Sequence, residues 1–97
     1  MDKKYPTEVD ELFDAILSLN SREECYMFFE DALTYKEILD IAQRLKAAKL
    51  LNDKTSYVDV CKITGMSTAT ISRVSKALDR GAGGYKLVME RIEGKND

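Results

Sequence analysis

A single glycine between two short apolar patterns constrains the fold of this chain more than any other feature. Gly65 follows an amphipathic stretch that begins after Ser56, and Met66 and Ser67 lead directly into a second one. Glycine takes the positive φ that a tight turn between two helices demands, and serine is a preferred helix N-cap. The segment from Ser56 to about Leu78 therefore predicts two short helices joined by a tight turn.

The spacing of apolar residues in this segment is that of a helix-turn-helix, in which buried side chains hold two short helices at a steep angle. Counted from Tyr57, the fourth, fifth, ninth, tenth, fifteenth and eighteenth positions of the motif are Val60, Cys61, Gly65, Met66, Ile71 and Val74. Thr64 departs from the motif at the eighth position, which is often aliphatic. An ordinary helical hairpin is the alternative, and the matches above favour the helix-turn-helix.

Three amphipathic helices are predicted before this segment. Apolar residues recur at helical spacing in the ranges 7–17, 21–33 and 34–51. Thr7 is the N-cap candidate of the first helix. The second and third helices begin with capping boxes, in which a Ser or Thr and a Glu three residues later satisfy backbone N–H groups. Asn52 is expected to end the third helix in a left-handed conformation.

The stretch after Leu78 contains three glycines, which predict a helix stop and a hinge before one last amphipathic helix. Their spacing does not match a phosphate-binding loop. The expected fold is thus all-α, with about six helices and a central helix-turn-helix in a single domain over residues 1–97. Residues 1–53 are its expected dimerisation part, 56–78 its helix-turn-helix, and 79–97 its hinge and C-terminal helix.

The length of the chain predicts an oligomer. A chain of 97 residues buries only about 60 to 65% of its unfolded surface, so its own core is marginal and a homodimer is expected. No apolar run approaches the roughly 18 residues that a membrane span needs. The N-terminus lacks the apolar region of a signal peptide. The sequence therefore predicts a cytoplasmic protein without membrane association.

The net charge of the chain is −2, but its charges are segregated along the sequence. Residues 54–86 carry six Lys and Arg against two Asp, whereas residues 1–53 carry seven basic against twelve acidic residues. A run of charge is most often only a solvated face. Here the basic stretch coincides with the predicted helix-turn-helix, and nucleic-acid binding needs Lys and Arg to neutralise phosphates. The distribution therefore favours double-stranded DNA as a partner.

The polar face of the second motif helix consists of small and cationic residues and carries no acidic residue. Small residues at the start of a helix let its backbone approach base edges, and Arg73 suits guanine O6 and N7 or a phosphate. The amides at the N-terminus of this helix suit a phosphate oxygen. The residues predicted to bind DNA are Ser67, Thr68, Ala69, Thr70, Ser72, Arg73 and Lys76.

Three classes of function compete for such a sequence. The expected one is a sequence-specific DNA-binding regulator that acts as a homodimer on a palindromic site. The alternative is a protein-interaction module that docks on a partner of the transcription machinery without specific DNA readout. An enzyme is not expected, because the chain has no histidine to serve as a general base. Cys25 and Cys61 lie too far apart for a CxxC metal or redox motif and are expected to be buried free thiols.

The residues also resemble a known family. The segment 64–75 resembles the DNA-reading segment of the tryptophan repressor, and the helix bearing Arg44 resembles that family's central helix. The run Gly84-Tyr85-Lys86-Leu87 resembles the YerC/YecD branch of Trp-repressor-like proteins. The resemblance implies an all-helical, intertwined homodimer in which the N-terminal helices of two chains interlock. It also implies transcriptional repression.

A corepressor site is part of this resemblance. In the tryptophan repressor two arginines hold the corepressor, and Arg44 and Arg73 fall at the matching positions, which makes them the candidate ligand-binding pair. The residue after the second arginine is a glycine there, leaving room for an indole ring, whereas here it is Val74. We therefore expect a different anion or DNA phosphates at these arginines, and no response to tryptophan. No cofactor or metal follows from the sequence, and an unidentified small-molecule corepressor stays open.

Overall fold

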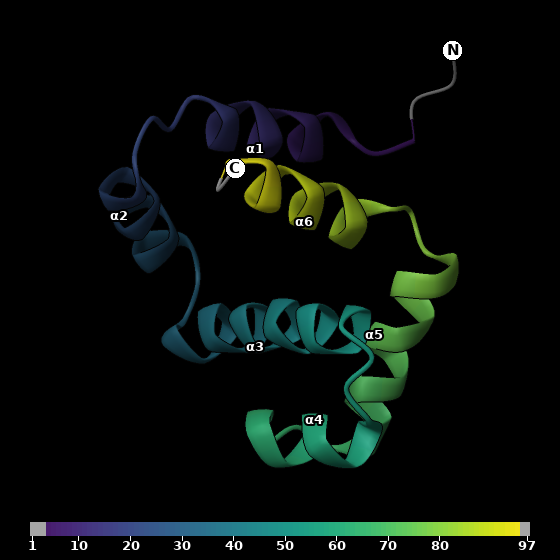
Figure 1. Ribbon diagram of the computed structural model, residues 1–97. Coiled ribbons are helices and arrows are strands. Elements are labelled where there is room, and N and C mark those ends of the chain that lie inside the picture. Colours follow the sequence, from purple (N-terminus) through teal and green to yellow (C-terminus); the bar gives the residue numbers. More distant parts are fainter. Residues whose placement is uncertain (1–3, 96–97) are drawn as a thin grey trace. The chain divides into compact units, whose positions relative to one another are not determined.

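Within residues 4–95, which the computed structural model describes, the protein consists of six α-helices and no strand (Figure 1). The number and order of helices confirm the predicted all-α fold. The helices are α1 (Thr7–Leu17), α2 (Arg22–Ala32), α3 (Tyr35–Asn52), α4 (Tyr57–Thr64), α5 (Thr68–Arg80) and α6 (Gly84–Lys95). Among these described residues, no helix combines the length and apolar character needed to cross a membrane. The chain divides into two compact units, Met1–Ile38 and Leu39–Asp97.

Capping boxes begin two of the helices, as predicted. The N–H of Glu24 donates to the Ser21 hydroxyl at 3.1 Å, and the Glu24 carboxylate accepts from the N–H of Asn20, one residue before the cap, at 2.7 Å. At the start of α3, the N–H of Glu37 donates to the Thr34 hydroxyl and the N–H of Thr34 donates to the Glu37 carboxylate. These bonds replace the intrahelical partners that the first turn of a helix lacks.

The start of α1 differs from the prediction. The N-cap is Pro6, and Thr7 is the first helical residue instead of the cap. Proline has no side-chain oxygen that could accept a hydrogen bond, so this helix begins without a side-chain cap. The carbonyl of Pro6 accepts the first helical hydrogen bond, from the N–H of Val9 at 3.0 Å.

The first unit has helices but no core of its own. Neither α1 nor α2 contains a buried residue, and Leu17 and Met27 are 81% and 68% exposed. Phe28 and Phe29 pack edge to face with ring centroids 5.2 Å apart, yet both stay half-buried. Residues 27–29, which lie in the expected dimerisation part, therefore form no buried core within one chain. Their expected part in a dimer interface stays a prediction.

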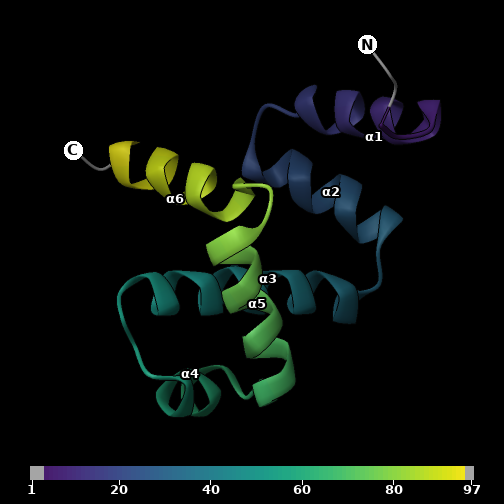
Figure 2. The ribbon, with the colours of Figure 1, turned by 90° about the vertical axis from the view of Figure 1, so that its right-hand side faces the viewer.

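The second unit is built around a small apolar cluster where α3, α4 and α5 meet. Its members are at most 3% exposed, and they are Ala47, Ala48, Val60, Ile71 and Val74. The two alanines of α3 are fully buried in this cluster. Cys61 and Met66 are half-buried against this cluster, and with it they confirm the predicted apolar positions of the helix-turn-helix. Figure 2 shows α5 crossing α3 at a steep angle.

The turn between α4 and α5 has the geometry that the sequence predicted. Gly65 takes φ 72° in the left-handed region, and its N–H donates to the Cys61 carbonyl at 2.8 Å. Thr64, which departs from the usual aliphatic residue, donates its hydroxyl to the Val60 carbonyl at 2.7 Å and accepts the N–H of Met66 at 3.2 Å. A polar side chain is therefore tolerated here because both its donor and its acceptor are used.

The end of α3 corrects the sequence prediction. The left-handed residue is Lys54, with φ 69°, and not Asn52, which is still helical. The N–H of Thr55 donates to the Leu50 carbonyl and that of Lys54 to the Leu51 carbonyl, both at 3.0 Å, which is the Schellman pattern of a helix end. The helix thus ends one residue later than expected, at Asn52, and the left-handed residue lies two residues after that end. A lysine holds the conformation that glycine usually takes.

The end of α5 is also later than predicted. The helix continues two residues beyond Leu78, through Arg80, and Gly81 ends it. A Cβ on Gly81 would collide with the carbonyl of Ala77, so no larger residue fits this stop. Tyr85 of α6 packs half-buried against the apolar cluster, and Met89 is 5% exposed.

Replacing Gly65 by alanine is expected to lower the free energy of unfolding by about 1 to 2 kcal/mol, because an L-residue is disfavoured in the left-handed region. A Cβ at Gly65 meets no atom within 4 Å, so the loss reflects backbone conformation alone. Gly84→Ala is the matched control, because its Cβ also meets nothing and its φ is not positive. Chemical denaturation measures both variants, and equal stabilities would contradict the assignment of the turn.

Candidate nucleic-acid interface

All residues predicted to bind DNA lie on α5 or cap it. Ser67, the N-cap, accepts the N–H of Thr70 at 3.2 Å, and the two hydroxyls lie 3.1 Å apart. Thr68 and Ala69 are exposed at the tip of the helix. Their N–H groups belong to the first turn, which has no intrahelical partners, and this turn carries no acidic residue. The positive end of the α5 dipole is therefore open to an anion.

One hollow beside α5 brings together the two arginines of the candidate ligand-binding pair. We call it the arginine hollow. It measures about 280 Å³, and its lining residues are Arg44, Thr70, Arg73, Val74, Ala77 and Tyr85. Arg44 and Arg73 are both exposed, and Val74 is 3% exposed because it also belongs to the apolar cluster. The hollow therefore places two guanidinium groups beside a closed apolar floor.

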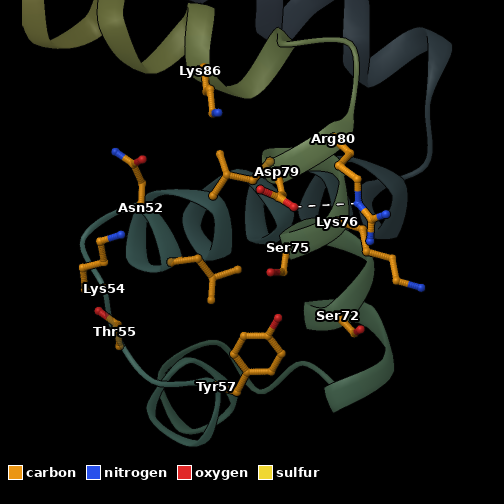
Figure 3. Close-up of a pocket in the computed structure, with 12 residues that line it drawn as sticks. Asn52, Lys54, Thr55, Tyr57, Ser72, Ser75, Lys76, Asp79, Arg80 and Lys86 are labelled. Carbon is orange, nitrogen blue, oxygen red and sulfur yellow. Dashed lines mark ion pairs between the residues drawn. The ribbon is translucent and has the colours of Figure 1, made fainter.

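A second hollow lies against α5 and includes cationic residues that are not among the predicted DNA-binding residues. We call it the lysine hollow, and Figure 3 shows it. It measures about 600 Å³, and its lining residues are Leu51, Asn52, Lys54, Thr55, Tyr57, Ser72, Ser75, Lys76, Leu78, Asp79, Arg80 and Lys86. Of the predicted residues, Ser72 and Lys76 line this hollow, whereas Thr70 and Arg73 line the other one.

The lysine hollow could be predicted only in part from the sequence. Lys54 and Lys86 contributed to the basic segment but lie outside α5, and Arg80 lies at its end. Their gathering depends on the Schellman turn after α3 and on the return of the chain into α6, which no local pattern reveals. The predicted contact set was therefore confined to α5 and its N-cap.

The two cysteines are both free in the structure. Cys25 and Cys61 are free and half-buried, so the expected free thiols are present but less enclosed than predicted. Over residues 4–95, no group of three or more Cys, Asp or Glu side chains is placed to hold a metal ion.

The fold and the site define a class. A capped helix-turn-helix on an all-helical scaffold, with no acidic residue in the first turn of its second helix, is typical of a helix-turn-helix DNA-binding protein. The family model described as Trp repressor protein matches residues 7–93, and the chain belongs to this Trp repressor family.

Individual relatives agree with this assignment. The uncharacterized protein YerC of Bacillus subtilis (strain 168) is 44% identical over 93 residues, which cover 96% of this chain and 89% of that protein. The crystal structure of a TrpR-like protein from Eubacterium eligens ATCC 27750 superposes with a TM-score of 0.88 at 48% identity, covering 91% of each chain. A crystal structure from Staphylococcus aureus gives the same TM-score at 44% identity, covering 92% of this chain and 89% of the other.

Proposed function

We propose that this protein is a homodimeric, sequence-specific DNA-binding regulator, a repressor by its family, with α5 as the recognition helix. The observation that carries the proposal is the helix-turn-helix itself, a capped α4 and α5 joined at Gly65 and packed on α3. Small exposed residues at the start of α5 suit close approach to base edges in the major groove. Because its partner is chromosomal DNA, the protein acts in the cytoplasm.

Within this interface the residues divide by role. Thr68 and Ala69, exposed at the start of α5, meet base edges, and an alanine or threonine methyl suits the methyl group of thymine. Arg73 pairs with a guanine or grips a phosphate, and Lys76 neutralises a phosphate. Ser67 and Ser72 offer hydroxyls to phosphate oxygens, while Thr70 supports the cap through its bonds with Ser67.

The homodimer is supported by surfaces that one chain leaves open. Large apolar side chains of α1 and α2 are exposed, and neither helix buries a residue. Large exposed apolar side chains on helices that bury no residue favour an interaction surface. The side-chain oxygen of Gln43 on α3 is buried without a hydrogen-bond partner among the described residues, and buried polar groups are normally satisfied. A second chain supplies the missing partners, and a two-fold symmetric dimer calls for a palindromic DNA site.

Arg44 and Arg73 are proposed to hold a small anion, or DNA phosphates, at the arginine hollow. Two guanidinium groups suit a carboxylate or phosphate, which they bind by charge-assisted hydrogen bonds. Tryptophan is not the proposed ligand, because Val74 supplies a β-branched side chain to the floor of this hollow.

A protein-docking function is the second candidate, and one observation favours it. Val58 and Ile63 of α4 are 63% and 51% exposed, which leaves apolar side chains on the outer helix of the motif. Such a module would bind its partner unchanged after loss of the cations of α5, and its DNA binding would be weak and without sequence preference.

Selection of bound sequences from a random DNA pool tests the proposal, and a palindromic site is the expected product. On that site, Arg73→Ala is expected to weaken binding about 10- to 100-fold, because a bidentate base contact contributes about 1 to 3 kcal/mol. Arg91→Ala, an exposed arginine of α6, is the matched control and is expected to bind normally. A selection that enriches no palindrome would reject this function in favour of the docking module, whereas equal affinities of the two variants would exclude Arg73 from the DNA contact.

A further inference from the structure

The lysine hollow differs from a small-molecule pocket in its composition. Its walls come from the end of α3, the turn after it, one face of α5 and the start of α6. Small-molecule sites are mostly apolar and enclose their ligand. Here only Leu51 and Leu78 supply aliphatic surface, and the lysine and arginine side chains at the rim are exposed. The composition of the hollow therefore suits a negatively charged partner that approaches from solvent.

The charge of this hollow is strongly positive. Four cationic side chains line it, Lys54, Lys76, Arg80 and Lys86, against a single carboxylate, Asp79. Asp79 pairs with Arg80 at 3.7 Å, and both side chains are more than three-quarters exposed, so this pair is weak. The three lysines form no ion pair within residues 4–95. In Figure 3, Lys54 lies on the turn after α3 and Lys86 points from α6 toward the hollow, whereas the side chain of Lys76 extends outward from α5 at the rim.

Hydroxyl groups complete the lining. Thr55, Tyr57, Ser72 and Ser75 all contribute to the wall, and in Figure 3 the Tyr57 hydroxyl points toward Ser75. Hydroxyl donors beside lysines are the groups with which proteins hold the phosphodiester backbone of DNA. A chain of phosphates satisfies several of these donors and cations at once.

The backbone at Lys54 adds an independent observation. This lysine is the non-glycine residue with positive φ among the described residues, and it stands at the position of the α3 stop where glycine is usual. A non-glycine residue held in the left-handed region is under local strain, and such strain recurs at functional sites. Here the strained residue contributes a cation to the lysine hollow.

We propose that the lysine hollow binds the DNA backbone, so that the protein grips phosphates with Lys54 and Lys86 in addition to the contacts of α5. This inference rests on the proposed function and extends it. The hollow is continuous with the proposed recognition face, because Ser72 and Lys76 belong to both. A strand whose bases meet the start of α5 therefore passes its phosphates between the α3–α4 turn and the start of α6.

The experiment uses the full chain and its selected DNA site, and compares the double variant Lys54→Gln/Lys86→Gln with wild type at several salt concentrations. The slope of log affinity against log salt is negative, and each lost phosphate contact reduces its magnitude by about 0.9, so a reduction of about two for each half-site is expected. Binding to the selected site at about 0.15 M salt is expected to weaken at least 10-fold. The preference for the selected site over random DNA stays unchanged, because phosphate contacts carry no sequence information.

Two controls separate charge at the hollow from general charge and from stability. Lys46→Gln/Lys49→Gln removes two exposed charges of α3 outside the hollow and is expected to leave the salt slope unchanged. Lys54→Gly relieves the left-handed strain, so its thermal midpoint does not fall, while its DNA affinity does. If Lys54 had only a structural role, Lys54→Gly would not lose DNA affinity while keeping its thermal midpoint.

Each result has one meaning. If wild type binds no selected site, the proposed function fails and with it the basis of this inference. If wild type binds its site specifically and Lys54→Gln/Lys86→Gln keeps both affinity and salt slope, only the proposal that the lysine hollow binds DNA phosphates is overturned. Titration with inorganic pyrophosphate tests a small-ligand site: tight binding that this double variant abolishes, with DNA binding unaffected, also overturns the inference.

Discussion

The double variant Leu17→Glu/Met27→Glu is expected to sediment as a monomer and to bind the DNA site at least 100-fold more weakly than wild type. These side chains are 81% and 68% exposed in one chain and belong to the helices that bury nothing by themselves. Two glutamates in an apolar dimer interface lose hydration without gaining partners. A monomer engages one half-site, and loss of the linked second half typically costs 10²- to 10⁴-fold in affinity.

Analytical ultracentrifugation and titration of labelled DNA measure this prediction. Arg22→Glu is the matched control, because it also lowers the net charge by two at an exposed position of the same unit. It is expected to stay dimeric, since an acidic residue in the first turn of α2 is favourable. Wild type supplies a further readout, a thermal midpoint that rises with protein concentration. A midpoint independent of concentration, or a wild-type monomer, would contradict the dimer.

Local patterns were enough to predict the helix-turn-helix. The caps at Ser56 and Ser67, the left-handed turn at Gly65 and the buried positions Val60 and Ile71 all depend on residues close together in sequence. Such features follow from backbone chemistry and helical periodicity. The fold of this segment could therefore be predicted without knowledge of the remaining chain.

Features that depend on distant segments could not be predicted in the same way. The apolar stripe of α1 indicates which face is apolar, but not which partner covers it. The stop of α3 falls at Lys54 because the hydrogen bonds from Thr55 and Lys54 fit there, although Asn52 has the better intrinsic preference for that conformation. The lysine hollow needs α6 to bring Lys86 next to α5.

Calorimetry of wild type with L-tryptophan is expected to give no binding heat, and Val74→Gly is expected to lower the free energy of unfolding by about 3 kcal/mol. Val74 is 3% exposed and packs in the apolar cluster, so its removal leaves a cavity. About 1 kcal/mol of the expected loss comes from placing a glycine inside α5. Val74→Ala is the control that opens part of the cavity without the backbone effect.

The same substitution separates the two roles of Val74. Its side chain belongs to the cluster that holds α5 on α3 and also to the floor of the arginine hollow, where the tryptophan repressor has a glycine. If Val74→Gly gains a tryptophan isotherm that wild type and Val74→Ala lack, the valine side chain is what excludes the indole ring. If all three proteins give no heat, Arg44 and Arg73 serve another anion or DNA itself. A micromolar isotherm for wild type would show that the valine leaves room for the ring, and the hollow would then be a tryptophan site after all.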